Sequence, residues 1–167
     1  MNEHELKKLL ENNSEVDIRI NEHLKKQRLF RQQPDMNEIE GHIAKSKHNL
    51  NFADDTKYSD WVLVGCYYAA YHMALALIMT KGYYSKNHDA TLCVLVRHFH
   101  LLQDELILLN SIALDTQDIL FYVEAKNKRE EASYLTQTSF DKNTINSIKL
   151  KTILFINKAN EIIDNSM

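Results

Sequence analysis

The chain has 167 residues, of which 44% are hydrophobic, and its formal net charge is −3 with histidine neutral. This is the size of one domain with a substantial apolar core, which excludes a disordered chain and a uniformly basic nucleic-acid-binding protein. Three glycines and one proline are too few for the many turns of a β-sheet protein, so the composition predicts an all-α fold.

The spacing of apolar residues and the positions of cap-like residues divide the chain into a series of predicted helices. Ser14 and Asp35 each begin a cap-like pair with an acidic residue three positions on, and Pro34 separates the two helices. Residues 83–87 are predicted to be a loop, whereas residues 101–111 are apolar and fit no single class. The predicted helices cover residues 3–11, 14–31, 35–52, 58–81, 88–100, 113–135 and 141–164.

These helices predict an up-down bundle of four to five core helices in residues 36–167, preceded by an N-terminal helical extension in residues 1–35. The helix over 58–81 carries apolar residues on two faces, so we expect neighbouring helices on two sides of it. Gly82 follows in the usual C-terminal position. The helix over 141–164 has apolar residues at alternating steps of three and four, which is typical of an amphipathic helix.

The most apolar segment raises the question of a membrane span. Residues 61–80 run for twenty positions without an acidic or basic residue, which is long enough to cross a bilayer. The segment also holds three tyrosines, a histidine, a glycine and a threonine, and its flanks lack an excess of Lys and Arg. These features favour a buried helix of the bundle, so we expect no membrane association.

The two cysteines indicate the cellular compartment. Cys66 and Cys93 each lie in an apolar stretch without other metal-binding residues beside them, so we expect buried thiols and no metal site. Two such thiols are typical of a reducing compartment. Residues 1–15 are charged and lack the apolar core of a secretory signal, so the expected location is the cytoplasm.

Charge is unevenly distributed in the second half of the chain. Residues 88–125 hold one Arg against six Asp and Glu, whereas residues 126–158 hold seven Lys and Arg against three Asp and Glu. A ligand with phosphate groups would prefer the second region. The alternative is that both regions are ordinary solvated helix faces.

Two segments far apart in the chain carry distinctive motifs. Residues 67–77 read Tyr-Tyr-Ala-Ala-Tyr-His-Met-Ala-Leu-Ala-Leu, and a glycine, a serine and a histidine follow at positions 82, 85 and 88. Residues 129–134 read Arg-Glu-Glu-Ala-Ser-Tyr. In this order and spacing the motifs resemble the HEPN family of prokaryotic helical domains, and the resemblance covers residues 37–165.

The resemblance implies a bundle of four or five helices that is frequently dimeric and linked to RNA or nucleotides. Some members of the family are toxin-like ribonucleases that need no metal, and others pair with a nucleotidyltransferase. We therefore expect a module that binds RNA, a nucleotide or a nucleotidyltransferase partner, in a toxin-antitoxin or defence-type system. A purely structural helical protein without a ligand is a further alternative.

The nuclease members of the family carry an Arg followed after a few residues by a His. The Arg would stabilise the developing charge of the phosphate, and the His would move a proton. Here Tyr134 stands where that His is expected after Arg129, and His100 is the last histidine of the chain. Because a tyrosine with a pKa near ~10 is a weak base at neutral pH, we expect binding rather than catalysis. The alternative is a metal-independent endoribonuclease that uses Arg129 and Tyr134.

The candidate binding residues are basic or lie near a predicted helix start. Arg129 either contacts phosphate or pairs with one of the glutamates near it, and His88 either contacts phosphate or caps or packs the loop before its helix. The candidate binding set is Lys86, His88, Lys126, Lys128 and Arg129. No cofactor motif is present, so the expected partners are RNA or a nucleotide, a nucleotidyltransferase and a second copy of the chain.

The aromatic motif itself is expected to belong mainly to the core. His72 lies on an apolar stripe, which favours a hydrogen-bonded core histidine over a ligand-binding one. Tyr67, Tyr68 and Tyr71 could stack on bases if they were exposed, but on so apolar a helix they are expected to be buried. Tyr134 is expected to pack with its hydroxyl at the surface.

Overall fold

The structure, a computed structural model, describes residues 3–100 and 113–166. Of this part of the chain 77% is helical, which confirms the predicted all-α bundle. The helices are α1 (Glu3–Glu11), α2 (Asn13–Lys25), α3 (Met36–Asp55), α4 (Ser59–Thr80), α5 (His88–Phe99), α7 (Thr116–Tyr134) and α8 (Lys142–Asp164). The segment over residues 101–111, which fitted no class by sequence, lies outside the described residues.

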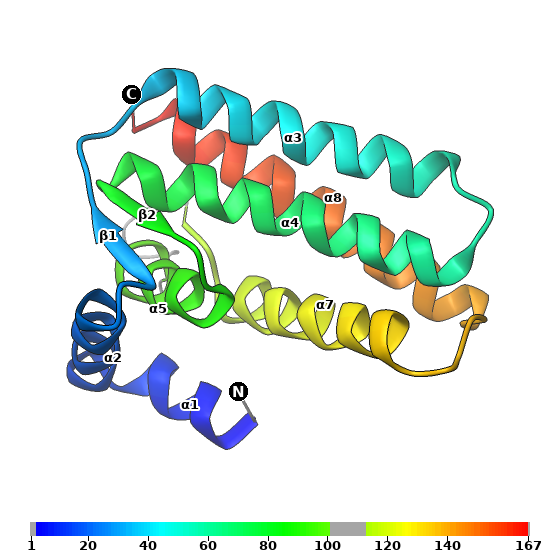
Figure 1. Cartoon of the computed structure of the whole chain (residues 1–167), viewed down its shortest axis with the longest axis horizontal. Helices are drawn as coiled ribbons and strands as arrows, with labels where there is room; N and C mark the ends of the chain where they lie inside the picture. Colours follow the sequence, from blue (N-terminus) through cyan, green and yellow to red (C-terminus); the bar gives the residue numbers. More distant parts are fainter. Residues whose placement is uncertain (1–2, 101–112, 167) are drawn as a thin grey trace.

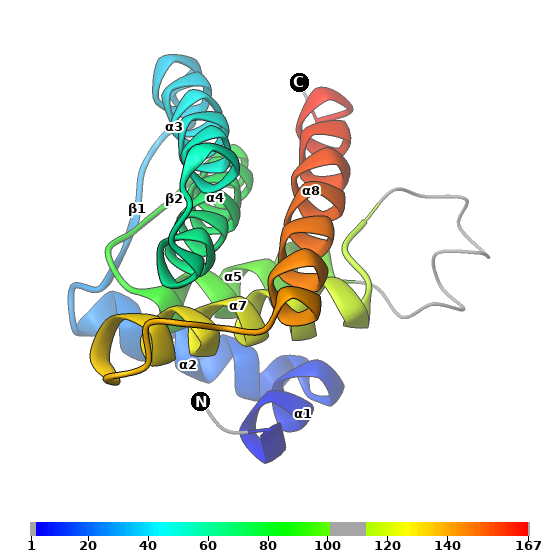
Figure 2. The ribbon, with the colours of Figure 1, turned by 90° about the vertical axis from the view of Figure 1, so that its right-hand side faces the viewer.

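Helix α4 is the centre of the bundle and packs against α3, α8, α7 and α5. Figure 1 shows α3, α4 and α8 running side by side with α7 below them, and Figure 2 shows the same layers from the end. The N-terminal helices α1 and α2 both pack against α5, so they lie beneath one end of the bundle. The prediction that α4 has neighbours on more than one side is confirmed.

The apolar composition of α4 follows from this central position. The helix is long and apolar enough to cross a membrane, and 78% of its most apolar stretch is buried inside the protein. Core helices of bundles are apolar on all sides for the same reason. Cys66 on α4 and Cys93 on α5 are buried free thiols, as predicted, and burial raises their pKa values to about 11 and about 12.

Two short strands interrupt the helical fold, and the sequence did not predict them. Strand β1 (Leu29–Arg31) pairs antiparallel with β2 (Tyr83–Ser85), with Phe30 opposite Tyr84. The predicted helix over 14–31 is therefore wrong at its end. It stops at Lys25 because Gln27 takes a left-handed backbone conformation with φ of 53°, which breaks the helix.

The ribbon formed by β1 and β2 also replaces part of the predicted loop over 83–87. Gly82, which ends α4 as predicted, has a φ of 73°, and its carbonyl oxygen accepts a hydrogen bond of 3.0 Å from the Gln32 nitrogen. A Cβ on Gly82 would lie 2.8 Å from the Gln32 carbonyl oxygen. A glycine is therefore required where the ribbon leaves α4.

The helix starts follow the sequence closely, with one exception. Asp35 caps α3 as predicted, since its carboxylate accepts hydrogen bonds from the backbone nitrogens of Asn37 and Glu38. The cap of α2 is Asn12 rather than Ser14, because the Asn12 side chain accepts from the nitrogens of Ser14 and Glu15 at 3.0 and 3.2 Å. The amphipathic pattern of α8 is confirmed, with these residues buried: Ile148, Thr152, Phe155, Ala159 and Ile162.

Candidate ligand-binding site

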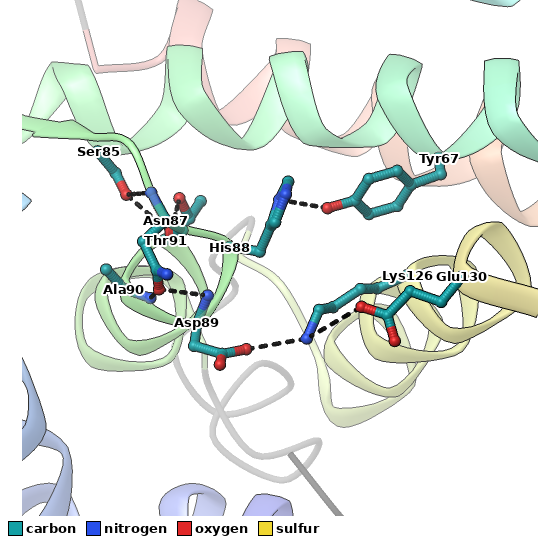
Figure 3. Close-up of polar contacts among 9 residues, drawn as sticks. All are labelled: Tyr67, Ser85, Asn87, His88, Asp89, Ala90, Thr91, Lys126 and Glu130. Carbon is teal, nitrogen blue, oxygen red and sulfur yellow. Dashed lines mark hydrogen bonds and ion pairs between the residues drawn. The ribbon is translucent and has the colours of Figure 1, made fainter. Parts of the chain in front are cut away.

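Three helices converge on Tyr67, which is buried in the middle of α4. His88, the first residue of α5, is hydrogen-bonded through Nδ1 to the Tyr67 hydroxyl, as Figure 3 shows. Arg129 on α7 places its guanidinium carbon 5.3 Å from the centre of the Tyr67 ring. The fold therefore brings His88 and Arg129, which are far apart in the sequence, against one tyrosine.

Arg129 is enclosed by aromatic rings and is only 9% exposed. Its guanidinium carbon lies 5.7 Å from the ring centres of both Tyr68 and Tyr134, and its Nη1 donates a 3.4 Å hydrogen bond to the Tyr134 hydroxyl. Its Nε is buried without a hydrogen-bond partner among the described residues. Burial alone would lower the Arg129 pKa, but the bond to Tyr134 and the facing tyrosines outweigh it, so the group keeps its charge.

The glutamates that were alternative partners of Arg129 are engaged elsewhere. Glu124 pairs with Lys151 at 2.7 Å, Glu130 lies 3.8 Å from Lys126, and Glu131 pairs with Lys128 at 2.8 Å. Within the described residues, Arg129 forms no ion pair with any carboxylate. Among the described residues, its positive charge is therefore stabilised by the π faces of the tyrosines and by the Tyr134 hydroxyl.

The rest of the basic region behaves differently from Arg129. Most of its lysines form ion pairs with acidic residues, so little of the basic surplus seen in the sequence is available to a ligand. The compensated lysines of residues 126–158 are Lys126, Lys128, Lys149, Lys151 and Lys158. In the described structure this leaves Arg129 and the exposed Lys142 of that region without an ion pair.

His88 is a half-buried neutral imidazole rather than a helix cap. Asn87 caps α5, since its side chain accepts from the nitrogens of Asp89 and Ala90. Burial lowers the pKa of His88, and the charges of Arg129 and Lys126 lower it further. Burial also holds the pKa of Tyr67 far above its ordinary value. The hydrogen bond between the Tyr67 hydroxyl and Nδ1 of His88 therefore joins two neutral groups.

The remaining predicted site residues lie in different surroundings. Lys126 reaches across to α5, where its Nζ is 3.2 Å from Asp89, as drawn in Figure 3. Lys128 forms an ion pair with Glu131. Lys86 directly follows β2, and its Nζ is 5.3 Å from the centre of the Phe30 ring. The structure thus brings His88 and Arg129 against Tyr67, and it places Lys126, Lys128 and Lys86 in contact with other groups.

The sequence missed part of this site by assigning its tyrosines to the core. Tyr67 is buried as expected, but its hydroxyl is the contact that holds His88. Tyr71 is only partly buried, and its ring centre lies 4.4 Å from that of His88. The four-residue spacing of Tyr67 and Tyr71 on one helix face was the available signal. Tyr134 was expected to pack, but it is 77% exposed.

A pair of histidines, separate from the site at Tyr67, lies between α3 and α4. Nδ1 of His72 is 3.0 Å from Nδ1 of His42, so His72 is a hydrogen-bonded, half-buried histidine, as predicted. Burial and then the neighbouring His42 and Lys45 lower the pKa of His72 to about 4. Among the described residues, no group of three His, Cys, Asp or Glu side chains is placed to hold a metal ion.

Comparison with known proteins adds no assignment to this geometry. No protein-family model matches the chain, and no curated protein matches it in sequence. Its function is therefore inferred from the surroundings of Arg129 and His88 and from the motifs described above.

Proposed function

We propose that the chain is a HEPN-like helical module that binds RNA or a nucleotide through a phosphate group at Arg129. The observation that carries this proposal is the buried guanidinium, which has no carboxylate partner in the described chain and a free Nε. A buried charge is unfavourable unless another charge or hydrogen bonds compensate it.

A phosphate would supply the missing partner. Its oxygens can accept the Nε–H and a terminal N–H of Arg129 together, which is the paired geometry that arginine favours. His88, once protonated, would add a second positive charge at the Tyr67 hydroxyl. The exposed Tyr134 ring beside Arg129 offers a flat surface for a base of the same nucleotide.

The partners follow from the family resemblance alone. On that ground we propose that the module forms a homodimer in the cytoplasm and acts with a nucleotidyltransferase in a toxin-antitoxin or defence-type system. Phosphate recognition at Arg129 does not depend on these partners, so it can be tested on the isolated chain.

Isothermal titration calorimetry with single-stranded RNA of about four nucleotides tests the binding proposal. Arg129→Ala should weaken binding about tenfold or more, because it removes hydrogen bonds to a charged group. Lys142→Ala is the matched control, since Lys142 is also a cation without an ion pair in the described structure but is exposed and lacks the tyrosine cage. Equal affinity of wild type and Arg129→Ala would contradict the proposal.

One observation also favours a metal-independent endoribonuclease as a second candidate. The sequence offers no histidine after Arg129, but His88 from α5 lies against the same Tyr67 ring. A neutral imidazole is a better base than Tyr134 at neutral pH. It would take the proton of a ribose 2′-hydroxyl while that oxygen attacks the adjacent phosphorus. The 5′-oxygen would then leave and take up a proton from water, and His88 would return the proton that it accepted to the solvent, giving a 2′,3′-cyclic phosphate and a 5′-hydroxyl end.

Cleavage of a mixed RNA pool in the presence of EDTA distinguishes the two candidates. A ribonuclease should release 5′-hydroxyl fragments, and both Arg129→Ala and His88→Ala should abolish them. RNA that is bound but left intact by the wild type would eliminate the second candidate and leave the first.

A further inference from the structure

The outer face of the β1–β2 ribbon carries a pair of aromatic side chains with a lysine over them. Phe30 and Tyr84 are directly opposite each other in the two strands, and their ring centres are 6.0 Å apart. Lys86 Nζ lies 5.3 Å from the centre of the Phe30 ring and 5.8 Å from that of Tyr84. Leu29 and Ser85, which point to the other face, are buried. Phe30 and Tyr84 are therefore partly exposed on the face that does not pack on the bundle.

The ribbon and its ends are also rich in uncompensated positive charge. Residues 28–34 and 80–88 contain four Lys and Arg and no Asp or Glu. These cations are Arg28, Arg31, Lys81 and Lys86, and none forms an ion pair with the described residues. Arg28 and Lys86 lie opposite each other, since the Lys86 nitrogen donates a 3.1 Å bond to the Arg28 carbonyl oxygen.

The other end of the ribbon opens into a hollow with the same charge. It has a volume of about 560 Å³ and is lined by Arg31, Lys81 and the backbone around Gly82. Cations therefore occur at both ends of the ribbon, and the aromatic pair lies between them. This order suits a chain of phosphates whose bases are unpaired.

The ribbon is continuous with the Arg129 site. Strand β2 leads through Asn87 directly into His88, and Figure 3 shows Ser85, Asn87 and His88 in succession beside Tyr67. Burial raises the pKa of Tyr71, and Tyr84 is among the groups that raise it further. Tyr71 in turn contacts His88. Tyr84 and His88 are four positions apart in the chain, which limits the distance between their Cα atoms to about 14 Å.

We propose that the outer face of the ribbon is a second subsite for the same ligand, and that this ligand is single-stranded RNA. Phe30 and Tyr84 stack on unpaired bases, while Arg28 and Lys86 neutralise the phosphates between those bases and the one at Arg129. Duplex RNA is excluded as the preferred ligand, because its bases are already stacked and their faces are covered. This inference rests on the proposed function, since it extends the ligand of the Arg129 site.

The connection between α3 and α4 offers a matched control for the ribbon. Phe52 in the last turn of α3 and Trp61 in the first turn of α4 form a similar aromatic pair on either side of it, with ring centres 6.3 Å apart, and Lys57 lies 5.3 Å from the centre of the Tyr58 ring. The end of α3 also carries acidic residues, including Asp55, which oppose binding of a polyanion. The two clusters thus share their ring contacts and differ in charge.

The experiment compares fluorescence anisotropy of labelled oligo(A) of about four and about twelve nucleotides. Two variants change the ribbon: the double variant Phe30→Ala with Tyr84→Ala, and Lys86→Glu, which reverses the charge of an exposed side chain. Phe52→Ala is the control, and Arg129→Ala removes the first site. Thermal unfolding by circular dichroism verifies the fold of each variant. Lys86→Glu keeps the test decisive if the aromatic double variant unfolds, because Lys86 is exposed and its side chain is not part of the core.

The wild type should bind the longer strand about tenfold more tightly than the shorter one. Both ribbon variants should remove this advantage and leave the affinity for the shorter strand unchanged, and Lys86→Glu should also reduce the salt dependence of binding. Phe52→Ala should change neither affinity.

Two results would overturn the ribbon subsite. The first is an unchanged affinity of both ribbon variants for the longer strand while Arg129→Ala abolishes binding, which would leave the proposed function intact. The second is tighter binding of an RNA duplex than of the single strand. Loss of the length advantage in the ribbon variants, together with no effect of Arg129→Ala, would instead support the ribbon and contradict the Arg129 site. A wild type that binds neither strand would contradict both.

Discussion

Two cations on the α7–α8 side of the bundle, Lys158 and Arg129, have opposite surroundings. Lys158 on α8 contacts two carboxylates, with its Nζ 3.1 Å from Asp115 and 2.5 Å from Asp118. The same two aspartates form the capping box at the start of α7. Arg129 near the other end of α7 is more deeply buried, yet it faces tyrosine rings and has no carboxylate among the described residues.

This difference separates a structural charge from one that is available to a ligand. Burial alone would lower the Lys158 pKa, but Asp118 and Asp115 outweigh it and raise the pKa above its ordinary value. The charges of Lys158, Asp115 and Asp118 therefore compensate one another and stabilise the fold, so none of them is left unpaired to bind a ligand. At Arg129 no carboxylate among the described residues supplies the counter-charge, and this is the observation on which the proposed function is based.

The largest expected effect is the loss of affinity for RNA caused by the substitution Arg129→Met. Methionine matches much of the side-chain volume and removes the charge, so affinity for single-stranded RNA should fall about thirtyfold, or about 2 kcal/mol. The free energy of unfolding should stay the same or rise, because a buried charge without a partner is replaced by an apolar group. Calorimetry and urea unfolding measure the two effects. A loss of stability as large as the loss of binding would show that Arg129 is structural.

The matched substitution Lys158→Met should have the reverse effect. It leaves Asp115 and Asp118 close together without their cation, so the free energy of unfolding should fall by about 2 kcal/mol. RNA affinity should remain within about twofold of wild type, since Lys158 pairs with Asp115 and Asp118 and not with the residues around Tyr67, which are His88 and Arg129. Urea unfolding at neutral pH measures the change. A stability equal to that of wild type would remove the contrast between the two cations.

Acidification should introduce an unbalanced charge at the His42–His72 pair. The pKa of His72 in the folded protein is about 4, below that of an exposed histidine. The unfolded chain therefore binds this proton first, and stability is lost as the pH falls from about 6.5 toward about 4. Between pH 7 and pH 5 we expect a loss of about 1 kcal/mol from this group, allowing for its partial exposure.

His72→Gln should reduce this acid sensitivity, and urea unfolding at the two pH values measures it. His48→Gln on α3 is the control, because His48 is exposed. Identical pH dependence in wild type and His72→Gln would contradict a lowered His72 pKa.

A smaller effect is expected on the pH dependence of RNA binding. The pKa of His88 is lowered in the free protein, so His88 is neutral at pH 7, and a bound phosphate would favour its protonated form. Affinity should therefore rise by about threefold as the pH falls from 7 to 6. His88→Gln should remove this rise in anisotropy titrations. A pH dependence that survives His88→Gln would assign the proton to another group.

The smallest expected effect is that of Tyr134→Phe. It keeps the ring beside Arg129 and removes only the oxygen that accepts the 3.4 Å hydrogen bond from Nη1. That bond is long and at the exposed end of the site, so affinity for RNA should change by no more than about twofold. The same calorimetric titration measures it. A loss comparable to that of Arg129→Met would mean that the hydroxyl itself contacts the ligand.

The long helices could be predicted from the sequence because their signals are local. The apolar residues of α4 and α8 recur at helical spacing within one segment, and Asp35 is next to the nitrogens that it caps. The ribbon could not be predicted, because three-residue strands give no periodic pattern and Phe30 meets its partner Tyr84 more than fifty positions away. The features close to its strands that mark where the ribbon begins are the left-handed backbone of Gln27 before β1 and Gly82 before β2, and only the glycine is visible in the sequence.

The candidate site was predicted only in part, for a similar reason. Arg129 was recognised from a motif within six residues of chain. Whether its charge is balanced depends on Glu124, Glu130 and Glu131, and the sequence does not say that lysines occupy all three. The approach of His88 to the same tyrosine depends on how α5 packs beside α4, which a reading along one helix does not reveal.

The most direct test of the central claim observes Arg129 itself by ¹H–¹⁵N NMR of the arginine Nε–H groups. The signal of Arg129 is assigned by its loss in Arg129→Met, and RNA of about four nucleotides is then titrated. We expect this signal to shift and to saturate with the affinity found by calorimetry, while the signals of Arg19 and Arg97, which pair with carboxylates, stay unchanged. RNA binding with an unmoved Arg129 signal would contradict the claim that the uncompensated guanidinium is the phosphate site.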